Sequence, residues 1–404
     1  MSIIRDVTVK ALKYLDIESI LIFVGARQSG KTTILKQIQS KLEASKETCF
    51  FLNLEDPEYL GLLNEHPRNL LKIFSFDLSR DKKYFVFVDE IQYLKDPSNF
   101  LKFIFDEYKE KIKLIVSGSS AFYIDKKFKD SLAGRKKIFN VHTLSFREFL
   151  RFKKEDILSQ KSFKEISLEE ENKIDLYYRE FIVYGGYPRV VLSPVEEKEN
   201  IIKELAYSYI KKDIYEAGIK KEDVFYKLFK ILSDQVGNLV NTSELANTLN
   251  VSKTAINNYL ETMRKSFHIA LISPFSKNLR KEISKMPKVF FYDLGLRNFF
   301  FGSFESFETR DDKGRLLENA VFRQLIEKHE NDQIKFWRTS AQNEVDFVVD
   351  EKKAYEVKVN INQFKKSKYK SFLESYPDID FSLISFNSKD VVKEDFAIRN
   401  VWEI

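Results

Sequence analysis

The stretch that decides the fold is Ile20-Leu-Ile-Phe-Val24, followed directly by Gly25-Ala-Arg-Gln-Ser-Gly-Lys-Thr32. The first five residues are all apolar and too few for a helix, so they predict a buried strand of a parallel sheet. The next eight fit the pattern G-x-x-x-x-G-K-[ST] at every fixed position. An apolar helical stripe then begins at Ile34. Strand, glycine loop and helix in this order predict a P-loop.

A P-loop holds the phosphates of a nucleotide, and each residue type in it has a task. Glycines let the backbone close around phosphate, while N–H groups and the helix N-terminus supply positive potential. Lys31 reaches the β- and γ-phosphates, and the Thr32 hydroxyl is a ligand for Mg²⁺. We therefore predict ATP and Mg²⁺ as cofactors, held by Gly25, Ala26, Arg27, Gln28, Ser29, Gly30, Lys31, Thr32 and Thr33.

A second polar group follows another apolar run, Phe85-Val-Phe-Val88, which ends in Asp89-Glu90. Ligands of open parallel sheets bind at the carboxyl ends of the strands, so both carboxylates are expected beside the P-loop. Asp89 would belong to the Mg²⁺ shell, and Glu90 would orient and polarise the attacking water. A lone Asp-Glu after a strand is often only a turn, but the P-loop and this pair together predict ATP hydrolysis.

Two more residues are candidates for the same site, each with a plain structural alternative. The apolar stretch Leu114-Ile-Val116 ends in Ser117, a candidate sensor of the γ-phosphate; the alternative is an ordinary strand-to-helix turn. Arg135, in Leu132-Ala-Gly-Arg135, is a candidate arginine finger that acts in its own subunit or in a neighbour of a homo-oligomer. Its alternative is a surface salt bridge.

The middle of the chain is expected to be helical. Ser145-Phe-Arg-Glu148 fits a helix-start capping box, and helical patterns alternate with charged loops up to about Gly218, which predicts a helical lid. Within it, Tyr184-Gly-Gly-Tyr-Pro188 predicts a sharp turn. This turn either contacts the nucleotide base or simply separates two helices.

Residues 226–292 have the pattern of a winged helix. Asn241 and Ser252 are expected to cap two successive helices, and two strands, Ile269–Ile272 and Val289–Tyr292, flank a basic loop. Phosphate contacts are expected from the start of the second helix and from the loop, which together contain Lys253, Thr254, Lys277, Arg280, Lys281, Lys285 and Lys288. The alternative is a module that only packs or binds protein.

The C-terminal part contains carboxylates in apolar surroundings. Asp346 interrupts an apolar strand, Val345–Val349, and a buried unpaired charge is costly, so it needs a metal or a cation as partner. In Ala354-Tyr-Glu356-Val-Lys358-Val359 the alternation places Glu356 and Lys358 on one face of a strand. A helix starting at Leu317-Glu318 could bring Glu318 to the same place.

Two explanations fit this C-terminal pattern. Asp346, Glu356 and Glu318 would bind Mg²⁺ while Lys358 steadies the attacking water, as in metal-dependent phosphodiester cleavage. Alternatively, Lys358 forms a buried ion pair with the carboxylates and no metal binds. Spacing leaves both open.

Composition excludes several classes of protein. The single cysteine, Cys49, excludes a disulfide framework and a cysteine-based zinc site, and the four histidines have no ligand spacing. No run of about 18 apolar residues occurs, and the first residues lack the apolar core of a signal peptide. We therefore expect a soluble, cytoplasmic protein with no membrane partner. Its net charge of +6 permits nucleic-acid binding without demanding it.

In this order, the motifs resemble an archaeal and bacterial family of AAA+-superfamily ATPases over nearly the full length. The resemblance implies ATP binding and a C-terminal domain of unknown function that looks like the PD-(D/E)xK restriction-endonuclease fold; it gives no substrate. Ala26 departs from the proline usual in the family, at a position between the fixed ones. The shared marks are Gly25–Thr32, Val88-Asp-Glu-Ile-Gln92, Ser117-Gly-Ser-Ser120, Leu132–Arg135, Gly185-Gly-Tyr-Pro188, Leu317-Glu318, Asn343-Glu-Val-Asp346 and Glu356-Val-Lys358.

The sequence thus predicts an α/β protein with a P-loop AAA+ parallel-sheet domain at 1–144, a helical lid at 145–225, a winged helix at 226–295 and a nuclease-like α/β domain at 296–404. The leading hypothesis is an ATP-hydrolysing switch or motor that acts on DNA. One rival is a nucleotide-gated signalling ATPase that binds protein partners and has an inactive C-terminal domain. Another is a DNA-binding regulator in which ATP is structural.

Overall fold

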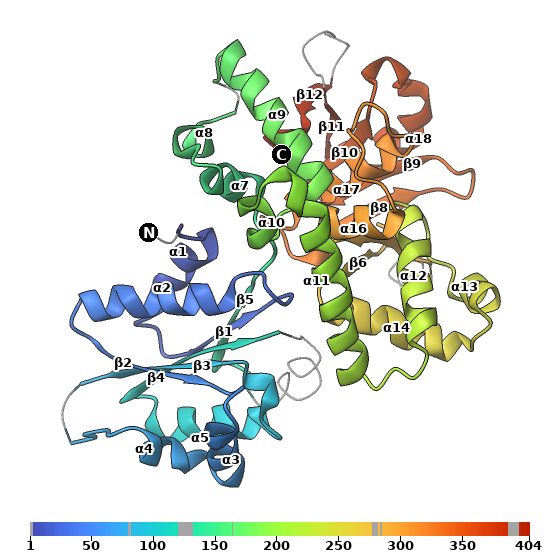
Figure 1. The fold of residues 1–404 in the computed structure, drawn as a ribbon. Coiled ribbons are helices and arrows are strands. Elements are labelled where there is room, and N and C mark those ends of the chain that lie inside the picture. Colours follow the sequence, from blue (N-terminus) through green and yellow to red (C-terminus); the bar gives the residue numbers. More distant parts are fainter. Residues whose placement is uncertain are drawn as a thin grey trace. The chain divides into compact units, whose positions relative to one another are not determined.

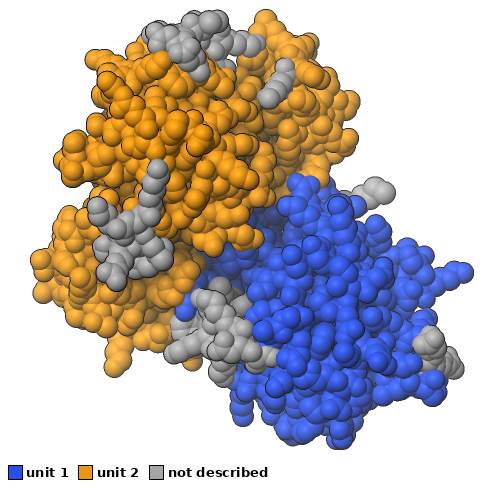
Figure 2. Space-filling model, turned by 180° about the vertical axis from the view of Figure 1, so that it is seen from behind, with its two compact units in different colours: residues 1–143, 265–267 blue, residues 144–264, 268–404 orange. Residues whose placement is uncertain are grey.

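The computed structural model describes residues 3–79, 82–119, 132–163, 165–276, 282, 285–386 and 396–404. The chain forms two compact units, shown in separate colours in Figure 2. Unit 1 comprises Met1–Thr143 with Lys265–Phe267, and unit 2 comprises Leu144–Arg264 with His268–Ile404. No helix in the described part of the chain is both long and apolar enough to cross a membrane.

Unit 1 is built on a five-stranded sheet in which all strand pairs are parallel. The strand order is β2-β3-β4-β1-β5, so β4 lies between the strand before the P-loop and the strand that carries Asp89. The three strands predicted from apolar runs are confirmed, and two others join them at the edges. The strands are β1 (Ile20–Val24), β2 (Thr48–Asn53), β3 (Tyr84–Asp89), β4 (Ile112–Gly118) and β5 (Lys136–Asn140).

Helices cover both faces of this sheet (Figure 1). On one face α1 (Asp6–Leu12) and α2 (Lys31–Ala44) pack on a cluster that includes Phe23, Phe87 and Ile115. The other face packs on α3, α4 and α5 through the alternate strand residues. The bounds on that side are α3 (Pro57–Glu65), η1 (Pro67–Asn69), α4 (Leu70–Ile73), η2 (Ile91–Tyr93) and α5 (Pro97–Tyr108).

Unit 2 begins with five helices, as the lid pattern predicts. The capping box before α7 is present in both directions: Ser145 Oγ accepts from Glu148 N at 3.1 Å, and Glu148 Oε2 accepts from Ser145 N at 3.0 Å. The helices are α7 (Phe146–Phe152), α8 (Asp156–Gln160), α9 (Leu168–Tyr184), α10 (Pro188–Leu192) and α11 (Val195–Glu216).

The double glycine between α9 and α10 has a structural explanation. Gly186 N donates to Asp293 Oδ2 at 2.9 Å, and Asp293 also caps the helix α16 (Leu294–Phe301). A Cβ at Gly185 would lie 2.4 Å from Asp293 Oδ1, and one at Gly186 would lie 2.5 Å from Leu144 O. Both positions therefore need glycine because protein atoms already occupy the space. The helix-break interpretation accounts for the motif.

The next segment contains the elements expected of the predicted winged helix. Asn241 Oδ1 accepts from Ser243 N and Glu244 N at the start of α13, and Ser252 Oγ accepts from Ala255 N near the start of α14. The elements are α12 (Glu222–Asp234), α13 (Thr242–Leu249), α14 (Lys253–Lys265) and the antiparallel strands β6 (Ile269–Ile272) and β7 (Lys288–Phe291). Lys277, Arg280 and Lys281, the wing cluster, lie outside the described residues.

The C-terminal part contains a mixed five-stranded sheet in the order β12-β11-β10-β9-β8. β8, β9 and β10 are antiparallel, whereas β11 pairs in parallel with both β10 and β12. The elements after α16 are α17 (Lys313–Leu325), η3 (Asn331–Gln333), β8 (Ile334–Arg338), β9 (Glu344–Val349), β10 (Lys353–Lys358), η4 (Ile361–Gln363), η5 (Lys366–Tyr369), α18 (Lys370–Ser375), β11 (Asp380–Ser385), β12 (Ala397–Asn400) and η6 (Val401–Glu403).

The larger of two hydrophobic clusters in unit 2 extends from its first helices to one face of the C-terminal sheet. It contains Phe149 of α7, Phe229 of α12, Phe290 of β7 and Phe347 of β9. The three segments predicted as lid, winged helix and C-terminal domain therefore share a core. The α/β class with a parallel P-loop sheet is confirmed, and a mixed sheet is present in the C-terminal part.

Candidate nucleotide site and C-terminal carboxylate face

The P-loop lies between β1 and α2, as predicted. Lys31 Nζ is buried and donates to the carbonyl oxygens of Gly25 at 2.9 Å and Ala26 at 2.8 Å, so its charge lies at the concave side of the loop. Gly25 is required by close packing, because a Cβ there would lie 2.0 Å from Val141 O. Gly30 has a φ of +100° directly before α2, a conformation that favours glycine.

Asp89 links the end of β3 to the end of β4 and to the first turn of α2. Thr32 Oγ1 donates to Asp89 Oδ2 at 2.6 Å, and Ser117 Oγ at the end of β4 donates to Asp89 Oδ1. Glu90 N donates to Ser117 Oγ at 3.3 Å. The structure therefore brings together four predicted residues from three separate stretches of sequence. The Ser117 hydroxyl therefore holds the Asp89 carboxylate and the backbone of Glu90.

Glu90 is held by Gln92, a residue for which the sequence predicted no role. Glu90 has a φ of +57°, which turns the chain sharply into η2. Gln92 Nε2 donates to Glu90 Oε2 and also to Ser119 Oγ, the latter at 2.9 Å. The backbone N–H of Ser119 donates back to Gln92 Oε1 at 3.3 Å. The only sequence signal was the spacing of a glutamine two residues after Glu90.

The residues present fit a Mg²⁺–nucleotide. Ser29 is fully buried in the loop, and its hydroxyl has no hydrogen-bond partner among the described residues. A buried hydroxyl without a partner is costly, so it is well suited to a ligand oxygen. Mg²⁺ usually keeps several waters and takes one or two protein groups plus phosphate oxygens, which Thr32 and Asp89 match.

The remaining P-loop candidates lie around this core. Arg27 is buried, and Gln28 has a φ of +53°. Arg5 Nη1 donates to Ser29 O at 2.7 Å, so α1 supports the loop from outside. Thr33 is exposed in the first turn of α2. These residues shape the loop and its rim.

Arg135 is not brought to this site. It directly precedes β5, and its carbonyl accepts from Ile20 N, so it lies at the amino edge of the sheet. The P-loop follows the carboxyl end of β1, roughly 16 Å further along a five-residue strand. Arg135 Nε pairs with Asp106 Oδ1 at 2.9 Å, and both side chains are about one-third exposed, 35% and 37%. Within one subunit, Arg135 therefore forms a surface salt bridge. Its action as an arginine finger on a neighbouring subunit stays a prediction.

In unit 2, the predicted carboxylates gather on the C-terminal sheet. Asp346 Oδ2 accepts from Val357 N at 2.8 Å, which fixes its place beside β10. Glu356 Oε1 accepts from Tyr369 Oη at 2.6 Å and from Lys358 Nζ. The negative charges of Asp346 and Glu356 act on Glu318 of α17 and contribute to its raised pKa. We call Glu318, Glu344, Asp346 and Glu356 the carboxylate face.

Burial dominates the electrostatics of this face. Desolvation and the charge of Asp346 raise the pKa of Glu356 to about 8, although Lys358 opposes the change. Desolvation and Asp346 likewise raise the pKa of Glu318 well above its ordinary value. Burial lowers the pKa of Lys358, but Glu356 and Asp346 outweigh it and leave that pKa raised. The two glutamates therefore hold protons more tightly than exposed ones do.

Lys288 corrects the prediction for the basic loop. It was expected to contact DNA, yet its side chain is only 1% exposed and pairs with Glu344. Burial opposes its charge, but Glu318, Asp346 and Glu344 raise its pKa. A lysine of β7 therefore belongs to the carboxylate face. Nothing in the local sequence distinguishes this buried lysine from a solvent-exposed one.

The carboxylate face is not a preassembled metal cluster. Within the described ranges, no group of three or more His, Cys, Asp or Glu side chains is arranged to hold a metal ion. Lys288 and Lys358 lie among the carboxylates and supply positive charge there. One acceptor nonetheless stands out: Glu356 Oε2 is buried and has no hydrogen-bond partner in the described structure.

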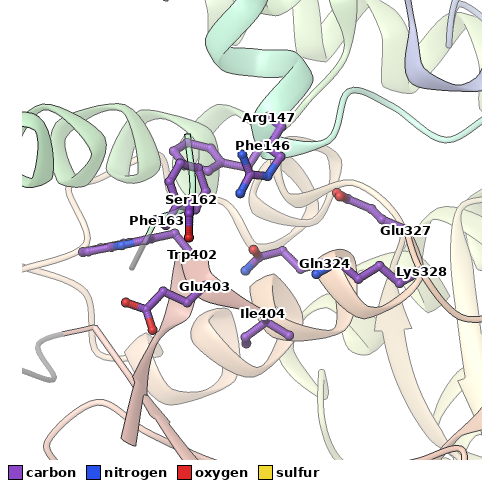
Figure 3. A pocket seen from close by; sticks show the side chains of 10 residues that line it. All are labelled: Phe146, Arg147, Ser162, Phe163, Gln324, Glu327, Lys328, Trp402, Glu403 and Ile404. Atoms are coloured by element: carbon purple, nitrogen blue, oxygen red, sulfur yellow. The ribbon is translucent and has the colours of Figure 1, made fainter. Parts of the chain in front are cut away.

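A separate cavity of about 140 Å³ lies elsewhere in unit 2, among α7, the end of α17 and η6 (Figure 3). The Arg147 guanidinium lies over the Phe163 ring at 4.1 Å and donates to two backbone carbonyls, so it is held by the protein. The lining carries charges of both signs and favours no one ligand class. It comprises Phe146, Arg147, Ser162, Phe163, Gln324, Glu327, Lys328, Trp402, Glu403 and Ile404.

Comparison with protein families agrees with the geometry of unit 1. Residues 18–150 match the model described as an AAA domain. Residues 175–306 and 313–402 match two domains of unknown function, DUF8612 and DUF4143. The parallel sheet with its P-loop is thus that of a P-loop AAA+ domain. The match over the C-terminal sheet names no nuclease.

Relatives and solved structures add little on function. The chain is 28% identical to an uncharacterised protein of Methanocaldococcus jannaschii, over 96% of this chain and 86% of that one. It is 27% identical to an uncharacterised protein of Haemophilus influenzae, over 78% and 76%. Aeropyrum pernix Orc1 in complex with DNA gives a TM-score of 0.32 at 11% identity, over 75% and 93% of the two chains. AMPPCP-bound DnaA of Aquifex aeolicus gives 0.33 at 14%, over 65% and 89%. Such low scores carry no argument about substrate or partner.

Proposed function

We propose that unit 1 binds ATP with Mg²⁺ and hydrolyses it. The observation that carries the proposal is the meeting of the P-loop and the ends of β3 and β4 at Asp89. Thr32 is the last residue of the P-loop, Ser117 is next to last in β4, and both hydroxyls donate to the same carboxylate. A buried carboxylate held in this way, one residue before a second carboxylate and beside a P-loop lysine, suits phosphoryl transfer to water.

Each side chain has a distinct task in this reaction. Lys31 binds the β- and γ-phosphates, and Ser29 offers its hydroxyl to a phosphate oxygen. Thr32 and Asp89 would hold the metal. When bound, Mg²⁺ neutralises charge on the phosphates. Glu90 orients the attacking water and accepts its proton. Because little covalent chemistry falls to the protein, positioning and charge account for most of the rate.

Two variants test the proposal. Lys31→Ala removes the principal side-chain charge that faces the phosphates, so nucleotide binding should be lost in an isothermal titration. Glu90→Gln keeps the size of the side chain but cannot accept a proton, so it should bind ATP and not turn it over. Nucleotide affinity of Lys31→Ala within a few-fold of wild type, or normal hydrolysis by Glu90→Gln, would contradict these assignments.

DNA is the partner that we propose for unit 2. Support comes from α14, whose first residues Lys253 and Thr254 are exposed, as are Asn257 and Asn258 one turn later. A helix start that presents a lysine and amides suits contact with phosphates and base edges. ATP turnover measured with and without duplex DNA separates the hypotheses. Stimulation by DNA supports an ATPase acting on DNA, indifference supports the signalling alternative, and binding without turnover supports a structural nucleotide.

A second candidate function concerns the carboxylate face. Glu356 Oε2, buried and without a partner among the described residues, favours a divalent cation beside Asp346. With a cation bound there, this nuclease-like arrangement would suit phosphodiester cleavage, with Lys358 beside the reacting oxygen. Titration with Mg²⁺ or Mn²⁺ tests it: wild type should bind and Asp346→Asn should not, while ATP turnover survives in both. Equal metal binding by the two proteins would exclude the site.

A further inference from the structure

We propose that Gln92 is a positioning residue for Glu90, which it holds through a side-chain clamp on Ser119. This inference rests on the proposed ATP hydrolysis, because it assigns the control of the carboxylate that activates water. The three side chains belong to two neighbouring strand ends, β3 and β4, within unit 1.

The orientation of the Gln92 amide follows from its partners. The N–H of Ser119 can only donate, so the amide atom that faces it at 3.3 Å must be the oxygen Oε1. The nitrogen Nε2 is then turned toward Ser119 Oγ, at 2.9 Å, and toward Glu90 Oε2. Gln92 is 6% exposed, so water does not compete freely for these bonds. The clamp thus fixes which amide atom meets the carboxylate.

The local backbone makes this contact possible. Glu90 adopts a left-handed conformation, and Tyr93 N donates to Glu90 O at 3.1 Å, which closes one tight turn. That turn brings the side chain at position 92 back beside the side chain at position 90. Gly118 provides the space for the Gln92 side chain, because a Cβ there would lie 3.3 Å from Gln92 Oε1. Ile91, 2% exposed, anchors the turn in the sheet core.

The consequence is a division of labour within one carboxylate. Gln92 occupies Oε2 of Glu90, which restricts the side chain to one orientation and leaves Oε1 for the attacking water. The amide is neutral and transfers no proton, so it acts only through Glu90. Reactions that depend on orientation are sensitive to such restraint: a misplacement of about 1 Å costs on the order of 100-fold in rate.

The end of β4 therefore supports both acidic residues of the site. Ser117 donates to Asp89, and Ser119 holds Gln92, which holds Glu90. Asp89 would fix the metal and Glu90 the water, so their relative position sets the geometry of the reaction. Ser117 is next to last in β4 and Ser119 follows the strand directly, so this short segment contacts both acidic residues.

The test uses the full-length protein and three substitutions. Gln92→Ala removes the clamp, and Gln92→Glu keeps its shape but replaces the N–H donor by a repelling oxygen. Gln39→Ala is the matched control, because Gln39 Nε2 donates to Glu43 at 2.8 Å on the exposed face of α2. We expect kcat to fall about 10- to 100-fold in both Gln92 variants, with ATP affinity within about two-fold of wild type. Gln39→Ala should match wild type in both.

A kcat unchanged in Gln92→Ala and Gln92→Glu would overturn the proposal. So would a loss of ATP affinity as large as the loss of kcat, because that pattern indicates a collapsed site. A second readout needs no turnover: the shifts in Tm of Glu90→Ala, Gln92→Ala and the double variant should be non-additive. Additive shifts would show that the two side chains do not interact. A wild type that binds ATP without hydrolysing it would refute the proposed function. The Tm shifts of the two single variants and the double variant would still show whether Glu90 and Gln92 interact.

Discussion

The carboxylate face makes the stability of unit 2 depend on pH in a defined direction. The pKa of Glu356 is raised to about 8 by burial and by Asp346. A carboxyl whose pKa is higher in the folded than in the unfolded state stabilises the fold when protonated. This contribution is complete below the ordinary glutamate pKa and is lost as the pH rises toward 8. Unit 2 should therefore become less stable between about pH 5 and pH 8.

The size of the effect follows from the two pKa values. Moving from the ordinary 4.5 to about 8 corresponds to roughly 5 kcal/mol of stability lost over that range. Glu356→Gln has nearly the same shape, stays neutral and still accepts from Tyr369. The variant should equal wild type near pH 4.5 and exceed it by up to about 5 kcal/mol at pH 8. A smaller slope should remain in the variant, because the pKa of Glu318 is also raised.

Tryptophan fluorescence isolates this unit. The chain has two tryptophans, and both Trp337 and Trp402 are buried in unit 2. Urea unfolding followed at pH 5, 6, 7 and 8 in metal-free buffer gives the two stability profiles. Glu374→Gln is the control, because Glu374 is 66% exposed and its loss should leave the profile unchanged. Parallel profiles for wild type and Glu356→Gln would refute the reasoning.

Three further predictions concern Arg135, the wing cluster and Lys288. If a neighbouring subunit uses Arg135 as an arginine finger, Arg135→Ala should abolish any rise of ATP turnover with protein concentration, whereas the control Asp106→Ala should not. If turnover per protomer depends neither on protein concentration nor on Arg135→Ala, the finger hypothesis is wrong. Serines in place of the wing cluster should flatten the log–log salt dependence of DNA binding by about 0.9 per lost phosphate contact. An unchanged slope would move the DNA contact elsewhere. Lys288→Met should destabilise unit 2 by about 3–5 kcal/mol, since it leaves buried carboxylates uncompensated; exposed Lys285 is the control, and equal melts for the two variants would contradict this.

The sequence revealed those parts of the site whose geometry is local. The P-loop pattern spans eight residues, and the loop between β1 and α2 follows from it directly. Asp89 could be placed beside it because a buried parallel strand must end at the same sheet edge. The capping box at Ser145 was predictable for the same reason: both partners lie within four residues. In each case the interaction and the pattern cover the same short stretch.

The distance between Arg135 and the P-loop could not be predicted, because one strand was missed. β5 reads Lys136-Lys-Ile-Phe-Asn140, with only two apolar residues, so no strand was predicted there. Without that strand nothing indicated at which edge of the sheet Arg135 lies. β5 pairs with β1 in parallel, which places the residue before it at the amino edge. The tertiary pairing, and not the local pattern, decided the outcome.

Other contacts could not be predicted from local sequence patterns, because their partners lie far apart in the chain. Lys288 and Glu344 are 56 residues apart, and Tyr369 reaches Glu356 from the end of η5, 13 residues later. Lysine and glutamate are mostly found on solvated surfaces, so neither residue type by itself indicates such a contact. Gln92 is closer to its target, but its role depends on a left-handed turn at Glu90 and on Ser119, 27 residues away. Such networks become visible only when the strands are assembled.

The strand β7 connects the predicted wing to the C-terminal part through packing and hydrogen bonds. Phe290 stacks on Phe322 of α17 with ring centroids 4.9 Å apart. Phe291 exchanges two backbone hydrogen bonds with the Asn319 side chain, one residue after Glu318. Lys288 of the same strand supplies positive charge to the carboxylate face. Close-packed interiors transmit small displacements, so a ligand that shifted β7 would move both a lysine and the helix that carries Glu318. The charge balance of the carboxylate face is therefore tied to the hairpin, and a DNA contact there would act on that face through the core that the two segments share.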